Sequence, residues 1–304
     1  MRGTTLALVS CALFGMGFIF KKVLLSSMSP VVITAFTSVF SAAVLFFFME
    51  IFHRIRELCV LCRREFLAII AVGFFSGFLA EFIFLVGLEH TSVSNAVLLS
   101  RTNALFMAFM ATIMFREKIT WNQIIGSIIM MLGLYVIATE GFSVGLSYRW
   151  GDLLLVSSGF LWALGNTIVK RYLDHVPPEV ILFGRCLVGG VALLFLSAES
   201  FGGEKITWDI LLNFLGLVLI STVAAYMLWY KALEMTQESN VGLTAFSIPL
   251  FTIISARIFL GEALAGYQMV GGSFILIGLI VLEVHLGQIK SIGGYAKIMR
   301  LLHT

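Results

Sequence analysis

The sequence consists of two copies of one unit, and this duplication limits the folds that the chain can adopt. The first copy contains Ser10, Leu13, Gly17, Lys22 and Pro30, which recur 148 positions later as Ser158, Leu161, Gly165, Lys170 and Pro178. The segment 87–95 recurs 145 positions later as 232–240. The same offset relates Glu117 to Glu262 and Gln123 to Gln268. Two offsets that differ by three residues indicate one duplication and a small deletion. In an apolar chain, such a repeat is typical of internally symmetric membrane carriers.

The chain is too apolar to fold as a water-soluble globule. Hydrophobic residues make up 60% of it and charged residues 12%, and the mean hydropathy is +1.02. A helix needs about 20 apolar residues to cross a bilayer. Ten such segments occur, at 3–25, 30–51, 66–88, 93–115, 121–139, 151–172, 178–197, 208–231, 241–260 and 265–285. We therefore expect an all-α integral membrane protein with ten transmembrane helices in two repeats, 1–140 and 151–286, followed by a basic tail over 287–304.

The number of helices per repeat predicts an inverted arrangement. Five is odd, so the second repeat enters the membrane from the side opposite to the first. Lys and Arg residues favour the cytoplasmic side. With the N-terminus inside, thirteen of them flank the spans on the inner side and four on the outer side. We therefore expect both termini in the cytoplasm and a multi-pass protein of the plasma or inner membrane.

Two segments of the second repeat resemble a known family. One is 157–171, followed by two prolines at 177 and 178; the other is 249–262, followed by Gln268, Gly271, Gly272 and Gly278. They resemble the first helix and the last two helices of the EamA repeat in the drug/metabolite transporter superfamily. The resemblance implies a ten-helix, alternating-access carrier, and many relatives are thought to export amino acids or other small metabolites. Ala104 and Arg116 depart from this pattern in the first repeat.

Charged residues inside the spans are the strongest candidates for function, because a charge near a helix centre costs about 2.5–3.5 kcal/mol on the insertion scale. Glu81 and Arg101 lie at similar depths on consecutive helices, so we expect them to pair. The pair is either structural or functional. In the functional alternatives, Arg101 anchors an anionic or zwitterionic substrate, or Glu81 carries a coupling proton. Arg185 is a further candidate for substrate binding.

Polar and aromatic residues at similar depths complete the predicted substrate site. Trp162 and Asn166 lie one turn apart on one helix face, and we expect this face to line the cavity. The other candidates are Asn103, Tyr226, Trp229 and Tyr230. Pro249 removes a backbone donor within the ninth span, and the resulting break either lines a cavity or is a structural kink.

The remaining motifs favour a carrier over other classes of protein. No phosphate-binding loop or catalytic motif is present in the sequence, so we expect no enzyme activity and no cofactor. Cys59 and Cys62 have the spacing of half a zinc site, but we interpret them as ordinary thiols and expect no metal. The alternatives are an intramembrane enzyme that acts on a lipid, or a channel for small solutes. The expected partners are a small metabolite and the lipid bilayer, not nucleic acid; a homodimer is left open.

Overall fold

A computed structural model of the protein describes residues 2–51, 55–59, 61–115, 121–141, 150–197, 207–235, 244–245, 247–278 and 280–281. The elements of the first half are α1 (Arg2–Leu24), α2 (Pro30–Ile51), the short α3 (Arg56–Cys59), α4 (Arg63–Val72), η1 (Gly73–Leu79), α5 (Ala80–Glu89), α6 (Val93–Ser100), α7 (Thr102–Phe115) and α8 (Trp121–Ala138). Those of the second half are α9 (Trp150–Tyr172), α10 (Pro178–Ser197), α11 (Trp208–Leu215), η2 (Gly216–Ala224), α12 (Ala225–Met235), α14 (Ser247–Phe259) and a helix over 266–278.

The described helices account for the ten predicted spans: α4, η1 and α5 form one continuous segment, α11, η2 and α12 form another, and α6 and α7 together cover the fourth span. Among the residues that the structure describes, six segments are long and apolar enough to cross a membrane: Thr5–Leu24, Pro30–Ile51, Arg63–Glu89, Trp150–Tyr172, Pro178–Leu196 and Trp208–Trp229. Shorter apolar helices cover Ile124–Ile137 and Ser247–Phe259. The prediction of an all-α membrane protein with ten helices in two halves is confirmed.

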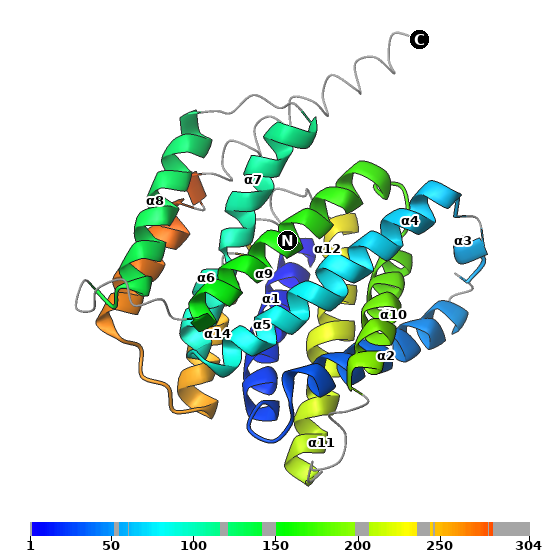
Figure 1. The fold of residues 1–304 in the computed structure, drawn as a ribbon, viewed down its shortest axis with the longest axis horizontal. Helices are drawn as coiled ribbons and strands as arrows, with labels where there is room; N and C mark the ends of the chain where they lie inside the picture. Colours follow the sequence, from blue (N-terminus) through cyan, green and yellow to red (C-terminus); the bar gives the residue numbers. More distant parts are fainter. Residues whose placement is uncertain are drawn as a thin grey trace.

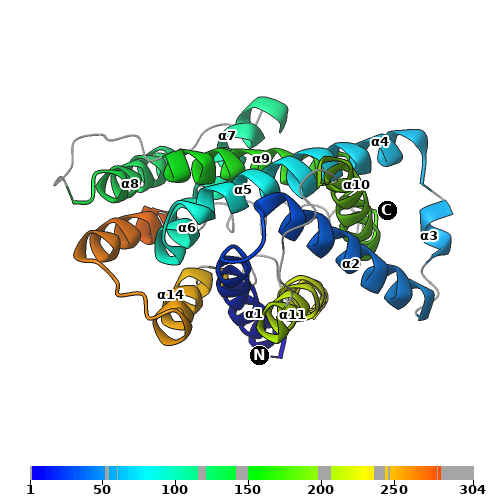
Figure 2. The same cartoon turned by 60° about the horizontal axis from the view of Figure 1, so that its bottom comes forward.

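The two halves interlock through equivalent helices. The first helix of the first half, α1, packs against α12 and α14 of the second half, whereas its counterpart α9 packs against α5 and α7 of the first. The second helices of the halves, α2 and α10, pack against each other. Figure 1 shows α5 running beside α9, and Figure 2 shows α1 between α11 and α14. Each repeat therefore completes the packing of the other.

Close contacts at two equivalent glycines show the same symmetry at the level of single residues. A Cβ atom at Gly17 of α1 would collide with the side chain of Ser221 in η2. A Cβ atom at the equivalent Gly165 of α9 would lie 2.6 Å from the Cβ of Ser76 in η1. Ser76 and Ser221 are themselves equivalent in the repeat. A small residue is thus needed twice, because close backbone approach drives helix association in lipid.

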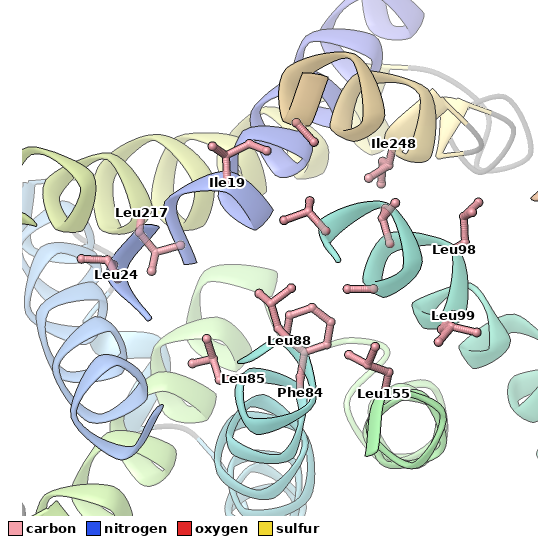
Figure 3. Close-up of a cluster of buried hydrophobic side chains, with 14 of the residues drawn as sticks. Ile19, Leu24, Phe84, Leu85, Leu88, Leu98, Leu99, Leu155, Leu217 and Ile248 are labelled. Atoms are coloured by element: carbon pink, nitrogen blue, oxygen red, sulfur yellow. The ribbon is translucent and has the colours of Figure 1, made fainter. Parts of the chain in front are cut away.

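The main core lies where α1, α5, α6, α9, η2 and α14 meet. Figure 3 shows Ile19, Leu85, Leu98, Leu155, Leu217 and Ile248 converging on it from these six elements. Phe84 of α5 is 1% exposed and lies among them. Because both halves contribute to this core, it holds the repeats together around the end of α1.

The fourth predicted span is interrupted, which the sequence analysis did not predict. α6 ends at Ser100 and α7 begins at Thr102, with Arg101 in a turn between them. The hydroxyl groups of Ser100 and Thr102 donate to the carbonyls of Val97 and Leu99, three residues earlier, at 2.8 Å each. Such side-chain bonds compete with the helical backbone pattern, and they flank the position at which the helix breaks.

Pro249 lies in the first turn of α14, which begins at Ser247, where a missing backbone donor costs little. The carbonyl of Ala245, four residues before Pro249, accepts instead from the amide of Ile248 at 3.1 Å. Pro249 therefore marks the start of a helix.

Candidate functional site

Two π-helices at equivalent positions of the repeats set the geometry of the site. η1 precedes α5 in the first half, and η2 precedes α12 in the second. A π-turn changes the direction in which the following side chains point, and such turns are frequent at functional sites. The second residue after each π-helix is Glu81 in one half and Tyr226 in the other, and these two are equivalent in the repeat.

Both residues converge on Arg185 of α10. The guanidinium Nη2 of Arg185 lies 3.0 Å from Oε1 of Glu81, and Nη1 donates to the hydroxyl of Tyr226 at 3.2 Å. Nη2 also donates to the carbonyl of Ser76 in η1 at 3.3 Å. The second carboxylate oxygen of Glu81 accepts from Nζ of Lys21 in α1 at 2.8 Å. One carboxylate thus joins a cation from the first half to a cation from the second.

This cluster has a net positive charge and stays accessible. Lys21 and Arg185 contribute two positive charges against the single negative charge of Glu81. The side chains of Lys21, Glu81 and Arg185 are 19%, 22% and 17% exposed. Because a buried charge in a membrane protein needs compensation, an accessible cluster with one excess positive charge favours an anionic ligand group.

Aromatic rings surround the cluster on two sides. On the side of Tyr226, the ring of Phe14 lies 4.9 Å from that of Tyr226 and 6.2 Å from that of Trp229, both edge-on. On the other side, Nζ of Lys21 lies 4.9 Å from the centre of the Phe84 ring. Trp162 packs against Phe84 at 5.2 Å. These rings offer flat apolar surfaces next to the charged groups.

The predicted face of Trp162 and Asn166 is split between two environments. The indole N–H of Trp162 is buried near the Glu81 carboxylate, yet it makes no hydrogen bond of good geometry within the described residues. Asn166 is exposed and donates to the sulfur of Met107 in α7 at 3.7 Å. The structure therefore places Trp162 beside the cluster, and Asn166 against α7.

Arg101 does not pair with Glu81, so that prediction is wrong. Arg101 lies at the break between α6 and α7, where its Nη2 donates to Ser100 at 3.4 Å. Its Nε is buried without a hydrogen-bond partner in the described part of the chain. Equal depth in the membrane did not decide the partner, because Lys21 and Arg185 reach Glu81 from other helices.

The other predicted residues lie around these two positions or outside the described side chains. Asn103 lies in the first turn of α7 and is half-buried. Trp229 packs in the core next to Phe14. The side chains of Tyr230 and Cys59 lie outside the described residues, whereas Cys62 is exposed. Within the described residues, no group of three or more His, Cys, Asp or Glu side chains could hold a metal ion.

Lys21 is the residue of this cluster that the sequence analysis did not single out as a site candidate. It was one of the four positive residues counted on the outer side, because it lies near the end of an apolar segment. The sequence does carry a signal: Lys21 and Lys22 are adjacent, so they point in different directions on a helix, and only one can extend directly toward water.

The internal symmetry agrees with the comparison against protein families. The model of the EamA-like transporter family matches residues 1–139 and again residues 149–284. The chain belongs to the EamA-like transporter family. This EamA protein is accordingly a multi-pass membrane transporter of the drug/metabolite transporter superfamily and not an enzyme, so the family prediction is confirmed.

Relatives of this EamA transporter are distant. An "Uncharacterized transporter" of Methanothermobacter thermautotrophicus is 28% identical over 283 residues, which are 88% of this chain and 82% of the relative. A "Probable amino-acid metabolite efflux pump" of Salmonella typhimurium is 25% identical over 61% of this chain and 66% of the relative. A crystal structure with a TM-score of 0.67 and 15% identity covers 93% of this chain and 97% of its own, and it shows the likeness of the fold.

Proposed function

We propose that this transporter is a secondary-active, alternating-access carrier that exports a small metabolite with a carboxylate group, such as an amino acid. The observation that carries the proposal is the bridge at Glu81, where Lys21 of the first half and Arg185 of the second meet one carboxylate at 2.8 and 3.0 Å. A substrate carboxylate has the same chemistry as the Glu81 side chain. It can therefore compete for the same two cations.

The excess positive charge gives the substrate carboxylate an electrostatic reason to bind. Arg185 presents a planar fork of donors suited to a carboxylate, and the hydroxyl of Tyr226 already shares its Nη1. Phe14, Trp162 and Trp229 supply surfaces for an apolar or aromatic side chain. We place Arg101 as a second cationic contact on the substrate's path, because its buried Nε has no partner among the described residues.

The position of the cluster suits alternating access. Glu81 and Tyr226 are equivalent in the two repeats and bind the same guanidinium, so the site lies where the halves meet. Carriers with internal repeats bind substrate at such an interface and rock the halves around it. Two relatives, from Salmonella typhimurium and Escherichia coli, are each named "Probable amino-acid metabolite efflux pump", and they support both the substrate class and the direction.

Displacement of Glu81 also suggests how transport is coupled. A carboxylate that has lost both cationic partners inside the membrane is costly, and binding a proton removes the charge. We therefore infer that export of substrate is linked to a proton on Glu81. A Glu81→Gln variant should still exchange substrate for substrate across a membrane, while net transport no longer responds to a pH gradient.

Orientation is part of the proposal. Thirteen positive residues on the inner side against four on the outer side favour cytoplasmic termini. The two repeats, 1–140 and 151–286, then insert in opposite orientations, and the protein lies in the plasma or inner membrane. A single cysteine placed at Arg56 in α3 tests this: a membrane-impermeant maleimide should not label it in intact cells. Labelling there would reverse the orientation.

Efflux from proteoliposomes loaded with radiolabelled L-amino acids tests the function. Arg185→Met and Lys21→Met should each reduce efflux at least about tenfold, since each removes a charge-assisted contact. Arg257→Met is the matched control, because Arg257 is exposed near the end of α14. Normal efflux by both site variants, or efflux of amines without a carboxylate at the same rate, would contradict the proposal.

A further inference from the structure

The turn between α5 and α6 is bound by polar contacts from α1, from α9, where Asp152 accepts from the Thr91 hydroxyl at 3.1 Å, and from the segment that follows α14. From α1, the ammonium group of Lys22 donates to the backbone carbonyls of Leu88 and Thr91 at 2.7 Å each and to that of Glu89 at 3.4 Å. These carbonyls lie at the C-terminal end of α5, where the helix dipole favours a cation. Lys22 thus fastens the end of α1 to this turn, residues 88–95, which we call the clasp.

The second half holds the other side of the clasp. The carboxylate of Glu262, just beyond α14, accepts from the amides of Val93 and Ser94 at 3.0 and 3.3 Å and from the Ser94 hydroxyl at 3.2 Å. A carboxylate at a helix N-terminus is favoured by the dipole and by the free amides. Gln268 donates to Asn95 at 2.7 Å and to Ser92 at 3.2 Å.

The clasp forms part of the lining of an open cavity. The cavity has a volume of about 900 Å³, and its lining includes Glu89, Thr91, Ser92, Asn95 and Gln268. Glu81 lies eight residues earlier in α5 than Glu89, which corresponds to about 12 Å along a helix. The clasp therefore follows Glu81 by about two helical turns along α5 and borders this cavity.

We propose that the clasp is the gate at this end of the transporter, and that Lys21 and Lys22 link it to the substrate site. The two lysines are adjacent in α1, and both bind α5 or the turn that follows it: Lys21 through the Glu81 carboxylate, Lys22 through the carbonyls at 88, 89 and 91. The link rests on the proposed function. When a substrate carboxylate replaces Glu81 as the partner of Lys21, Lys22 is the one of these two lysines that still holds α1 to α5 and the clasp. The clasp then opens more readily.

The duplication supports a gating role. Lys22, Glu262 and Gln268 have sequence equivalents in the other repeat, namely Lys170, Glu117 and Gln123. The clasp sequence itself recurs, with Glu89, Thr91, Ser94 and Asn95 matched by Glu234, Thr236, Ser239 and Asn240. A carrier that alternates needs a closing device for each end, and two inverted copies of one unit provide it.

Hydrogen exchange of backbone amides, followed by mass spectrometry on the purified full-length protein, tests the gate. Lys22→Met should speed exchange in peptides covering 88–95 at least about tenfold, because it removes charge-assisted bonds that hold this turn. Peptides from α10, which packs against α2 and η1, should keep their exchange rates. Lys22→Arg, which retains a cation, should stay close to the unmodified protein, and Glu262→Gln should act in the same direction as Lys22→Met.

Each other result has a defined meaning. Unchanged exchange over 88–95 in Lys22→Met, or an equal increase in α10, would overturn the gate. Loss of folded protein in both Lys22→Met and Glu262→Gln would also overturn it, because the contacts would then belong to the fold.

The link is tested with a mixture of L-amino acids, which should speed exchange over 88–95 in the unmodified protein but not in Lys21→Met. If the mixture has no effect while Lys22→Met still speeds exchange, the gate stands, and the link and the proposed substrate class fall. If amino acids are transported and Lys22→Met leaves exchange unchanged, the gate falls and the proposed function stands.

Discussion

Arg185 and Glu81, 104 positions apart in the chain and in different repeats, lie 3.0 Å from each other and form a charged contact between the halves. The same carboxylate binds Lys21 at 2.8 Å. This bridge connects α1, α5 and α10, three helices that must move relative to one another if the halves rock. A substrate carboxylate that replaces Glu81 would break this bridge, and the loss of the bridge lowers the free-energy cost of moving the halves.

Replacing Glu81 by Gln should destabilise the folded protein, since it leaves two cations without their carboxylate. Stranding a buried charge costs about 3 kcal/mol or more, which should appear as a lower melting temperature in detergent. Adding Lys21→Met to this variant should recover part of the loss, because removing both partners costs less than removing one. Glu50→Gln is the control, because Glu50 is exposed near the end of α2. A double variant less stable than Glu81→Gln alone would contradict the assignment of the pair.

Replacing Arg101 by Met should separate stability from transport. The buried Nε of Arg101 has no partner in the described residues. Losing the charge therefore removes a desolvation cost and leaves no described carboxylate without a cationic partner. The melting temperature should stay the same or rise, whereas amino-acid efflux should fall. A lower melting temperature with normal efflux would instead assign Arg101 to the packing of the break between α6 and α7.

His175 should make stability depend on pH. In the loop between α9 and α10, its ring lies 3.0 Å from the carboxylate of Asp174 and 2.6 Å from that of Glu65 in α4. The hydrogen bond to Asp174, and then that to Glu65, raise the pKa of His175 above its ordinary value of 6.5. The protonated form is thus favoured by folding, so the stabilisation is complete below about pH 6.5 and is lost as the pH rises through the higher folded pKa.

The melting temperatures of the unmodified protein and of His175→Gln should be compared from about pH 5.5 to about pH 9, because histidine side chains titrate within this range. The difference should be largest at the acidic end and shrink toward the alkaline end. Since His175 is exposed, the effect should also weaken in high salt. A difference that grows with pH would have the wrong sign for this contact.

Replacing Gly278 by Ala should disrupt the seam between α8 and the last described helix. A Cβ atom at Gly278 would lie 2.6 Å from the carbonyl oxygen of Gly126, so the two backbones must separate. Overpacking of this kind costs about 1–3 kcal/mol. Gly266→Ala in the same helix is the control, because a Cβ there meets nothing within 4 Å. Equal melting temperatures for the two variants would show that the seam does not limit stability.

The sequence by itself determined the number of helices, their division into two halves and the family. Insertion into lipid depends on the apolarity of each segment taken alone, and the duplication is visible in residues such as Gly17 and Gly165 without any structure. Within the segments, the sequence also identified Glu81, Arg101, Arg185 and Tyr226 as polar groups that a membrane span must compensate.

Only the tertiary structure decided which of these groups meet. Depth along a helix leaves open the rotation of each helix about its axis, and a pair of consecutive helices is not always the closest pair in space. The π-turns before Glu81 and Tyr226 rotate both side chains, so that they converge on Arg185. The packing of α1 against the second half brings Lys21 to the same carboxylate. The break at Arg101 and the start of α14 at Pro249 likewise depend on local hydrogen bonds, which hydropathy does not encode.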